Sequence, residues 1–351
     1  MGISNVIEES KLRAIQQAAR QLEAGALVGF PTETVYGLGA DAENPAAVAS
    51  IYAAKGRPSN HPVIVHLAPE ADLAYWARDI PPEAHKLIAA FWPGPLTLIL
   101  KRADNIPDTV SGGQDSIGLR CPSHPVAQAL LRAFKGGKGG VAAPSANKFG
   151  HVSPTTAQHV MDEFPLETVP GGVIAAVLDG GQSEVGIEST IVDLTRLATH
   201  GPVLLRPGDI SAAQLAEVLG VLPADRNAAD AAAPRASGTL DAHYAPNTPV
   251  VLVAADALAT TMQQLTAAGR SFALMSHSVA GKTGALAQLL LPAEPHGYAH
   301  DLYADLRALD AAHADIILVE ALPDDKDWQG VSDRLRRAAF DSAEVLGKLL
   351  G

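Results

Sequence analysis

Residues 26–41, ALVGFPTETVYGLGAD, join a short apolar run to a polar and glycine-rich segment. The run 26–30 has the composition of a buried strand, and Pro31 ends it because proline has no N–H for a sheet ladder. In proteins that alternate strands with helices, the segments that follow strands are the usual ligand-binding loops. We therefore expect an α/β fold whose first strand leads into such a loop.

Alternating strand and helix signals continue on both sides of this stretch. Residues 12–22 place apolar side chains at helical spacing, with Ser10 as a candidate N-cap and Gly25 as a candidate end. The expected strands are 63–67, 96–100, 117–119, 140–143, 173–178, 190–194 and 203–205, and the expected helices are 45–54, 82–91, 124–134 and 211–219. This pattern predicts a mixed α/β domain with a large twisted sheet over residues 1–210.

A change in composition marks the end of that domain. Residues 224–236, ADRNAADAAAPRA, contain seven alanines and show neither strand nor helix periodicity. We interpret residues 211–248 as a flexible interdomain linker that ends in HYAP (243–246).

Residues 249–351 are expected to form a smaller, Rossmann-like parallel α/β domain. Helical stretches separate its short apolar strands, which are 249–254, 271–275 and 314–320. This part of the sequence has no GxGxxG or GxxxxGK motif, so no nucleotide site is predicted there.

Composition excludes several classes of protein. With 351 residues, 47% of them hydrophobic, the chain is long enough for two domains with separate cores. A formal charge of −12 excludes a protein that binds nucleic acids through an overall basic surface. The N-terminus lacks a signal-peptide pattern, no apolar stretch is long enough to span a membrane, and the single cysteine, Cys121, has no metal-ligand spacing. We therefore expect a soluble, cytoplasmic protein with no metal ligands of its own.

One stretch departs from this acidic average. Residues 116–161 contain five basic residues and no acidic residue. These cations form either a pocket for an anion or a solvated basic face, and charge alone favours the solvated face. The five are Arg120, Arg132, Lys135, Lys138 and Lys148.

The segment KGRP (55–58) offers a more specific anion site. Lys55 and Arg57 are two residues apart, so in an extended segment their side chains point the same way. Pro58 favours extended backbone at Arg57. Two converging cations are suited to a phosphate, which Arg binds bidentately and Lys binds as a compact charge. Two separate surface cations remain the alternative.

The segment SAN (145–147) adds neutral hydrogen-bonding groups. Ser145 and Asn147 are also two residues apart and offer a hydroxyl and an amide to an oxygen-rich ligand, although both residues are common in simple turns. The sequence has no evident Ser-His-Asp order, carboxylate pair or metal cluster. This favours electrostatic positioning of a charged substrate over covalent hydrolysis.

Taken together, these motifs resemble those of the YrdC-type threonylcarbamoyl-AMP synthase family over about residues 10–210. The trailing domain resembles the long form of that family. The stretches that carry the resemblance are PTETVYGLGAD (31–41), KGR (55–57), FWPGPLTLIL (91–100), SAN (145–147), GIESTIVDL (186–194) and LLRPG (204–208).

The resemblance implies an enzyme that converts L-threonine, bicarbonate and ATP, with Mg²⁺, to threonylcarbamoyl-AMP and pyrophosphate. The product feeds threonylcarbamoyladenosine synthesis in tRNA, through a downstream transferase machinery. The charge of −12 and the lack of an apolar stretch long enough to span a membrane predict no membrane partner and weak or absent direct binding of tRNA.

The family's pattern also implies roles for residues of this chain. Its catalytic positions correspond to Lys55, Arg57, Ser145 and Asn147. Its ATP-binding positions correspond to Arg57, Asn60, His61, Ser116, Ser145, Ser153, Arg206 and Tyr244. Its threonine-binding positions correspond to Thr34, His66, Arg120, Ala143 and Ser189, with Arg120 as the partner of the substrate carboxylate. No residue is implied as a metal ligand.

Two departures from the family pattern leave details open. Asn60 and His61 both precede Pro62, so either one fills the nucleotide contact expected there. The linker has Ser237–Gly238–Thr239–Leu240 where many long members have PGM before HY.

Two other functions are compatible with parts of the sequence. One is a transferase that forms an unsubstituted carbamoyl-adenylate, although such proteins carry zinc-finger-like cysteines that this chain lacks. The other is a non-catalytic RNA-binding module built on residues 116–161, which the charge of −12 disfavours.

Overall fold

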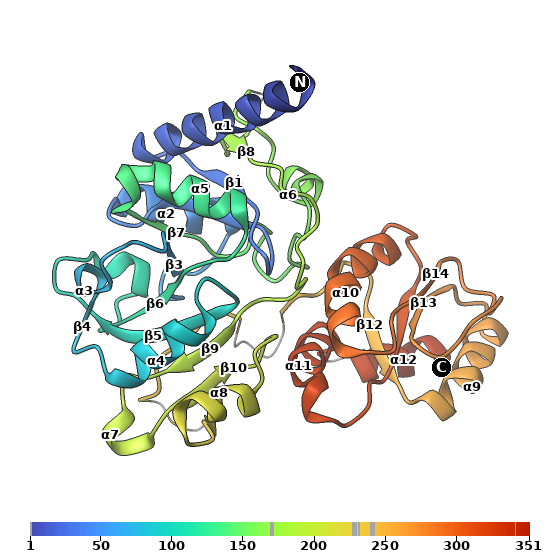
Figure 1. The fold of residues 1–351 in the computed structure, drawn as a ribbon. Helices are drawn as coiled ribbons and strands as arrows, with labels where there is room; N and C mark the ends of the chain where they lie inside the picture. Colours follow the sequence, from blue (N-terminus) through green and yellow to red (C-terminus); the bar gives the residue numbers. More distant parts are fainter. Residues whose placement is uncertain (1, 169–171, 227–229, 231, 239–242, 341) are drawn as a thin grey trace. The chain divides into compact units, whose positions relative to one another are not determined.

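The computed structural model describes residues 2–168, 172–226, 230, 232–238, 243–340 and 342–351. Its contacts divide the chain into two compact units (Figure 1). The first unit comprises residues 1–149, 154–184 and 188–239, and the second comprises residues 150–153, 185–187 and 240–351.

A large mixed sheet forms the centre of the first unit. Its strands are β1 (Val28–Phe30), β2 (Gly37–Asp41), β3 (Ile64–Leu67), β4 (Ala77–Arg78), β5 (Leu96–Arg102), β6 (Ser116–Arg120), β7 (Gly140–Ala142), β8 (Ala176–Val177), β9 (Thr190–Asp193), β10 (Val203–Arg206) and β11 (Ala224–Asp225). The order is β11-β10-β9-β5-β6-β3-β7-β2-β1-β8, and β4 pairs with β5. The predicted mixed α/β domain with a large sheet is confirmed.

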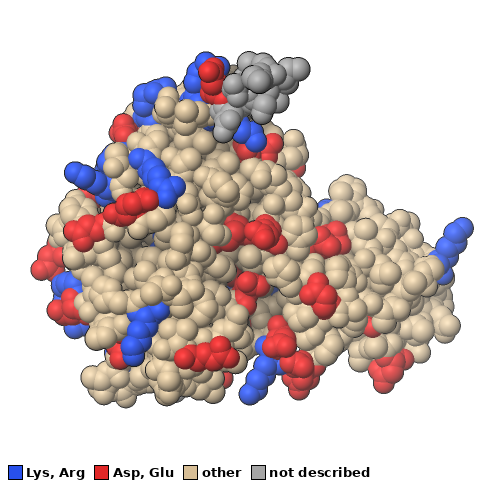
Figure 2. Space-filling model, in the orientation of Figure 1, with Lys and Arg blue, Asp and Glu red and all other residues tan. Residues whose placement is uncertain are grey.

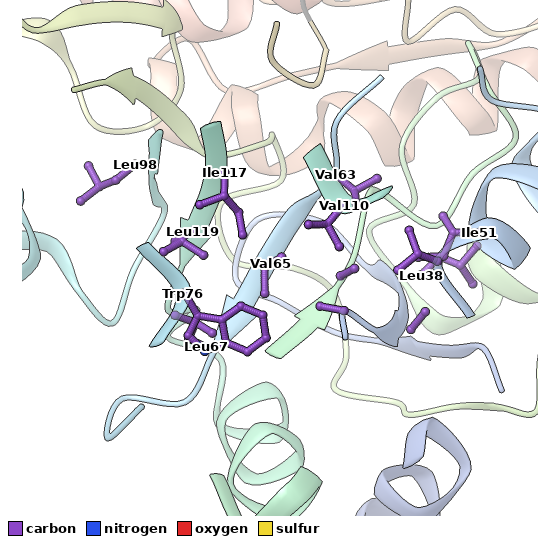
Figure 3. Packing of buried hydrophobic residues seen from close by; sticks show 14 of the residues in the cluster. Leu38, Ile51, Val63, Val65, Leu67, Trp76, Leu98, Val110, Ile117 and Leu119 are labelled. Atoms are coloured by element: carbon purple, nitrogen blue, oxygen red, sulfur yellow. The ribbon is translucent and has the colours of Figure 1, made fainter. Parts of the chain in front are cut away.

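Helices cover this sheet and build its cores. They are α1 (Gly2–Glu23), α2 (Pro45–Lys55), α3 (Leu73–Trp76), α4 (Pro82–Phe91), α5 (Pro125–Ala133), α6 (Ala157–Glu163), α7 (Leu197–His200) and α8 (Ala212–Leu219), with the 3₁₀ helices η1 (Asp108–Ser111) and η2 (Phe134–Gly137). Helices α1 and α5 share one core with β1, through side chains such as Leu22, Phe30 and Leu130. A second core includes Ile51 of α2, Val65 of β3 and Leu119 of β6 (Figure 3).

Strand β2 lies within the segment that the sequence predicts to be a ligand-binding loop. The segment GLGAD (37–41) has too few large apolar residues to predict a strand, but every one of these residues is buried. A side chain at Gly39 would place its Cβ 2.9 Å from both Phe30 and Val141. Glycine therefore allows Phe30 to pack directly against β2, and the loop is confined to residues 31–36.

The second unit contains the predicted parallel sheet. Its strands β12 (Val250–Val253), β13 (Phe272–Ser276), β14 (Gln288–Leu290) and β15 (Ile316–Glu320) lie in the order β12-β15-β13-β14, and all pairs are parallel. Its helices are α9 (Ala255–Ala267), α10 (Pro295–Asp310), α11 (Gln329–Ala338) and α12 (Ser342–Leu350), with the 3₁₀ helix η3 (Lys326–Trp328). The smaller parallel α/β domain is thus confirmed, with β14 as a strand that the sequence analysis does not predict.

Residues 211–248, interpreted from sequence as a linker, contain regular structure in part. Helix α8 begins with a capping box at its N-terminus. The side chains of Ser211 and Gln214 each accept a hydrogen bond from the other's main-chain N–H. Strand β11 pairs in parallel with β10. Residues 239–242 lie outside the described part of the chain. Among the described residues, no helix is both long and apolar enough to cross a membrane.

Candidate active site

The carboxyl end of α2 positions Lys55. Gly56 adopts a left-handed conformation (φ 63°) and caps the helix, so Lys55 is its last residue. The Lys55 ammonium donates hydrogen bonds to the carbonyl oxygens of Ser145, at 2.6 Å, and Asn147. Lys55 is 3% exposed, and burial, with a smaller contribution from the charge of Arg57, holds its pKa well below the usual range.

The observed geometry of residues 55–57 differs from the extended segment that their spacing predicts. Lys55 is helical and the chain turns at Gly56, so Lys55 and Arg57 do not form the extended segment that their spacing predicts. Their charges nevertheless interact, because Arg57 contributes to the lowered pKa of Lys55. The helix cap, rather than strand alternation, sets the relation between the two cations.

The loop after β7 supplies the hydrogen-bond acceptors for Lys55. The main-chain N–H of Ala146 donates to the carbonyl of Tyr36, and that of Leu38 donates to the carbonyl of Pro144, both at 2.9 Å. These bonds hold the loop alongside β2. The carbonyl oxygens of Ser145 and Asn147, rather than their side chains, therefore contact Lys55.

Two arginines from distant parts of the sequence meet at Ser237. Arg57 Nη2 lies 3.2 Å from Ser237 Oγ, and Arg206 Nη1, at the end of β10, donates to the Ser237 carbonyl at 2.9 Å. Both guanidinium groups are buried, with Arg57 7% and Arg206 3% exposed. Positive charge is therefore concentrated where Ser237 contacts the sheet.

Arg206 also holds Ser189, the residue that precedes β9. Arg206 Nε and Nη2 donate to the Ser189 carbonyl at 3.0 and 2.9 Å, and Nη2 lies 3.1 Å from Ser189 Oγ. The Ser189 hydroxyl also lies 2.8 Å from Oγ1 of Thr97 on β5. Ser189 is thus fixed between a cation and a second hydroxyl.

The loop between β1 and β2 is organised by threonine hydroxyls. Thr32 Oγ1 accepts hydrogen bonds from the main-chain N–H groups of Thr34 (3.2 Å) and Val35 (3.3 Å), and lies 2.9 Å from Thr34 Oγ1. These contacts form a side-chain turn of the kind that Ser and Thr favour. They fix the main chain on both sides of Glu33.

Arg120, the last residue of β6, forms a buried ion pair with Glu33. Arg120 Nη2 donates to Glu33 Oε1 at 2.7 Å, and the two side chains are 5% and 4% exposed. Glu33 Oε2 accepts a hydrogen bond from the main-chain N–H of Ser123 at 3.1 Å. Arg120 pairs in register with His66 on the neighbouring strand β3.

His66 is a neutral residue in this cluster. Burial, reinforced by the charge of Arg120, lowers the pKa of His66 to about 3. Its ring lies edge-on to Phe30, with ring centroids 5.8 Å apart. The imidazole therefore adds no second positive charge beside Arg120 at neutral pH.

The depressed pKa of His66 predicts an acid-sensitive fold. An unfolded histidine binds a proton below about pH 6.5, whereas folded His66 does so only near pH 3. Neutral His66 therefore makes its full contribution to the free energy of unfolding above pH 6.5. This contribution is lost as the pH falls towards 3. Between pH 7 and pH 5 the free energy of unfolding should drop by about 2 kcal/mol from this group alone.

Urea unfolding of the wild type and His66→Gln at these two pH values measures that loss. His66→Gln should show a pH-dependent drop smaller by about 2 kcal/mol. A matched His85→Gln change, at an exposed position on α4, should follow the wild type. Equal drops in the wild type and His66→Gln would contradict the assignment.

Several hydrogen bonds hold residues 235–237 against the rest of the first unit, to which they belong. The main-chain N–H of Arg235 donates to Gln114 Oε1 at 2.7 Å. The Arg235 guanidinium donates to the carbonyls of Asn60 (3.2 Å) and Gly112 (2.9 Å). This part of the predicted linker is therefore a structured cover over the first unit.

Beneath this cover lies a small hollow of about 10 Å³, enough for roughly one water molecule. Its floor is an apolar part of the sheet that includes Ile64, Ile99 and Ile191, and its rim includes Ser116 and Ser237.

Three further predicted residues lie on this unit. His61 lies with its ring centroid 5.6 Å from that of Phe149, over which Arg57 also lies at 5.9 Å. The Asn60 carbonyl instead accepts the bond from Arg235. The Ala143 N–H donates to the carbonyl of Ile64 at 2.9 Å, directly after β7.

Ser153 and Tyr244 belong to the second unit. Tyr244 is 1% exposed and has a left-handed backbone (φ 62°), which is uncommon for a bulky residue. Its ring lies 4.1 Å from the His243 ring, and the Arg334 guanidinium carbon lies 5.5 Å from its centroid. The HY pair is therefore packed within this unit.

The acid-free run 116–161 does not form the solvated basic face that its charge favours. Each of three cations has carboxylate partners from outside the run: Arg120 contacts Glu33, Arg132 contacts Glu70, and Lys135 contacts Asp41 and Glu43. Basic and acidic residues are interspersed on the face shown in Figure 2. Tertiary contacts bring in the acids that the local sequence lacks, so the run is not a continuous basic face.

Several residues of the site are absent from the sequence prediction. They are Glu33, Thr97, Gln114 and Ser237, whose contacts join positions distant in the chain. Glu33 and Thr97 stand in stretches that carry the family resemblance, 31–41 and 91–100, and Ser237 stands in the linker stretch that departs from it. The local sequence does not predict the contacts of any of them.

Two protein families match this chain. The Sua5–YciO–YrdC family, described as "Telomere recombination", matches residues 20–208. The family described as "Threonylcarbamoyl-AMP synthase, C-terminal domain" matches residues 210–340.

Individual relatives span nearly the whole chain. A threonylcarbamoyl-AMP synthase of Pyrococcus abyssi is 37% identical over 342 residues, covering 95% of each chain. One of Bacillus subtilis is 38% identical, covering 93% of this chain and 92% of the relative. The crystal structure of P. abyssi Sua5 complexed with L-threonine is similar to this structure with a TM-score of 0.83 and 33% identity, covering 93% of this chain and 94% of that chain.

Proposed function

The chain belongs to the threonylcarbamoyl-AMP synthase family, and from that premise we propose that it converts L-threonine, bicarbonate and ATP to threonylcarbamoyl-AMP and pyrophosphate. The observation that carries the proposal is the convergence of Arg57 and Arg206 on Ser237, next to buried Lys55. Such a cluster of cations suits the phosphates of ATP.

The chemistry requires alignment and charge neutralisation. Threonine and bicarbonate first give a carbamate with loss of water. A carbamate oxygen then attacks the α-phosphorus of ATP, and the bond from that phosphorus to the bridging oxygen breaks to release pyrophosphate. Phosphoryl chemistry of this kind depends on positioning and on stabilising the charge of the transferred group.

The nucleotide would bind at the cation cluster. Lys55, Arg57 and Arg206 would neutralise the phosphates, with Ser145 and Asn147 beside the reacting groups. Phosphate binding beside Lys55 would also favour its ammonium form, because an anion stabilises the charged state.

We assign no protein ligand to Mg²⁺. The described residues hold no group of three His, Cys, Asp or Glu side chains that would bind a metal. The ion would be held by the phosphates of ATP and by water, as Mg²⁺ often is. When bound there, it would supply further neutralisation of the phosphate charge.

Threonine would bind at the Thr34, His66, Arg120, Ala143 and Ser189 positions. Arg120 would bind the α-carboxylate, and the fixed hydroxyls of Thr34 and Ser189 would contact the substrate's polar groups. The solved P. abyssi relative was complexed with L-threonine, which supports threonine as the amino-acid substrate. We expect the product to be passed to a tRNA-modifying transferase in the cytoplasm, with little direct binding of tRNA here.

Pyrophosphate release should require L-threonine. With ATP and labelled bicarbonate, the wild type should release pyrophosphate with threonine and much more slowly with serine, which lacks the methyl group, or with no amino acid. Product identity is checked by recovering the label in an adenylate. Equal rates with threonine, with serine and without an amino acid would refute the proposed reaction.

A further inference from the structure

The pairing of Arg120 with Glu33 bears on which edge of the Arg120 guanidinium faces the substrate, a point that the proposed function leaves open. Arg120 is buried, and a guanidinium has five N–H donors in a fixed plane. Which edge of that plane faces a ligand depends on which donors the protein has already engaged. The engaged donors can be identified from the contacts of Arg120.

The protein engages one edge of Arg120. Nη2 donates to Glu33 Oε1 at 2.7 Å, and Nε lies 3.4 Å from the Gly94 carbonyl oxygen. Nε and Nη2 share the side edge of the guanidinium plane. Among the described residues no acceptor contacts Nη1, so the end edge, formed by Nη1 and the second N–H of Nη2, is left for a bidentate carboxylate.

Glu33 is itself held firmly enough to set this orientation. Its second oxygen accepts from the Ser123 N–H at 3.1 Å, so the carboxylate bridges Arg120 and the segment that follows β6. The hydroxyl turn of Thr32 fixes the main chain beside Glu33. Both charged side chains are almost completely buried, where the loss of either partner leaves a costly unpaired charge.

We propose that Glu33 is a positioning residue for substrate recognition: it engages the side edge of Arg120 and thereby presents the end edge to the α-carboxylate of threonine. The inference rests on the proposed function, because it needs Arg120 to bind that carboxylate. Glu33 itself does not contact the substrate. It acts by fixing the plane and direction of the guanidinium.

Two substitutions and a substrate lacking the carboxylate test this role. Glu33→Gln removes the charge that holds Arg120, and Glu33→Asp keeps the charge but is too short to reach both Arg120 and Ser123. L-Threoninamide replaces the α-carboxylate with a neutral amide. The measurements are kcat and KM for pyrophosphate release with each substrate, together with thermal unfolding of each variant.

Glu33→Gln should raise the KM for threonine about tenfold or more, with kcat at saturating threonine changed little, as expected for loss of an oriented charge-assisted hydrogen bond. The preference for threonine over threoninamide, as a ratio of kcat/KM, should fall by about the same factor. Glu33→Asp should give an intermediate ratio. Glu70→Gln, at an exposed Arg132 pair on the surface of the same unit, should leave both values as in the wild type.

The outcomes separate this inference from the proposed function. A folded Glu33→Gln or Glu33→Asp protein with the wild-type preference for threonine over threoninamide would overturn the positioning role, even if its overall activity were lower. Should Glu33→Gln not fold, the ratio measured with Glu33→Asp decides. Failure of the wild type to release pyrophosphate with threonine would instead refute the proposed function.

Discussion

Replacing Lys55 or Arg57 with alanine should lower turnover about 10²- to 10³-fold, the usual loss when one preorganised electrostatic group is removed from an active site. Lys55 is buried at the end of α2, and Arg57 shares Ser237 with Arg206, so neither charge can be replaced by water without disturbing the cluster. Arg57→Lys should also be impaired, because an ammonium cannot bind a phosphate with a planar fork.

Steady-state pyrophosphate release measures these effects. Lys138→Ala provides a matched control, because Lys138 is an exposed lysine of the same unit and has no role in the proposed site. It should retain the turnover of the wild type. If Lys55→Ala and Arg57→Ala both remain folded and turn over at the wild-type rate, the nucleotide site has been assigned to the wrong residues.

Arg120→Met should have the largest effect on stability. The substitution leaves the Glu33 carboxylate buried and without its ionic partner. In comparable buried pairs, such a loss lowers the free energy of unfolding by about 3–5 kcal/mol. Threonine-dependent activity should be lost as well, because the proposed partner of the substrate carboxylate is gone. Chemical denaturation gives the free energy of unfolding, and pyrophosphate release gives the activity.

The double variant Arg120→Met with Glu33→Gln isolates the buried charge. The free energy of unfolding of the double variant should be about 2 kcal/mol higher than that of Arg120→Met alone. The reason is that burying a neutral amide costs less free energy than burying an unpaired carboxylate. Activity should stay low in both proteins. A double variant that is no more stable than Arg120→Met would show that the unpaired charge is not the cause of the loss.

Local sequence patterns predicted the alternation of strands and helices and, through it, the two α/β domains. Strands such as β3 and β5, and helices such as α2 and α4, appear close to their predicted bounds because local periodicity and caps specify them. Strand β2 is not predicted from the sequence, because its glycines provide no hydrophobic pattern. In the structure, Phe30 and Val141 pack closely against it.

The motifs 55–57 and 145–147 likewise marked Lys55 and Asn147, but the local geometry inferred from their spacing was wrong for Lys55. Whether a side chain lies on a strand or at a helix end depends on where the helix is capped, and Gly56 decides that.

Contacts between distant segments of the folded chain determine which charges pair. Residues 116–161 contain no acidic residue. Three of their cations nevertheless form ion pairs with acidic residues from earlier segments: Arg120 with Glu33, Arg132 with Glu70 and Lys135 with Asp41. Ser237, from the stretch interpreted as a flexible linker, joins Arg57 to Arg206. Sequence periodicity reflects local main-chain geometry, whereas the charge and hydrogen-bond partners of a buried side chain come from chain segments that folding brings together.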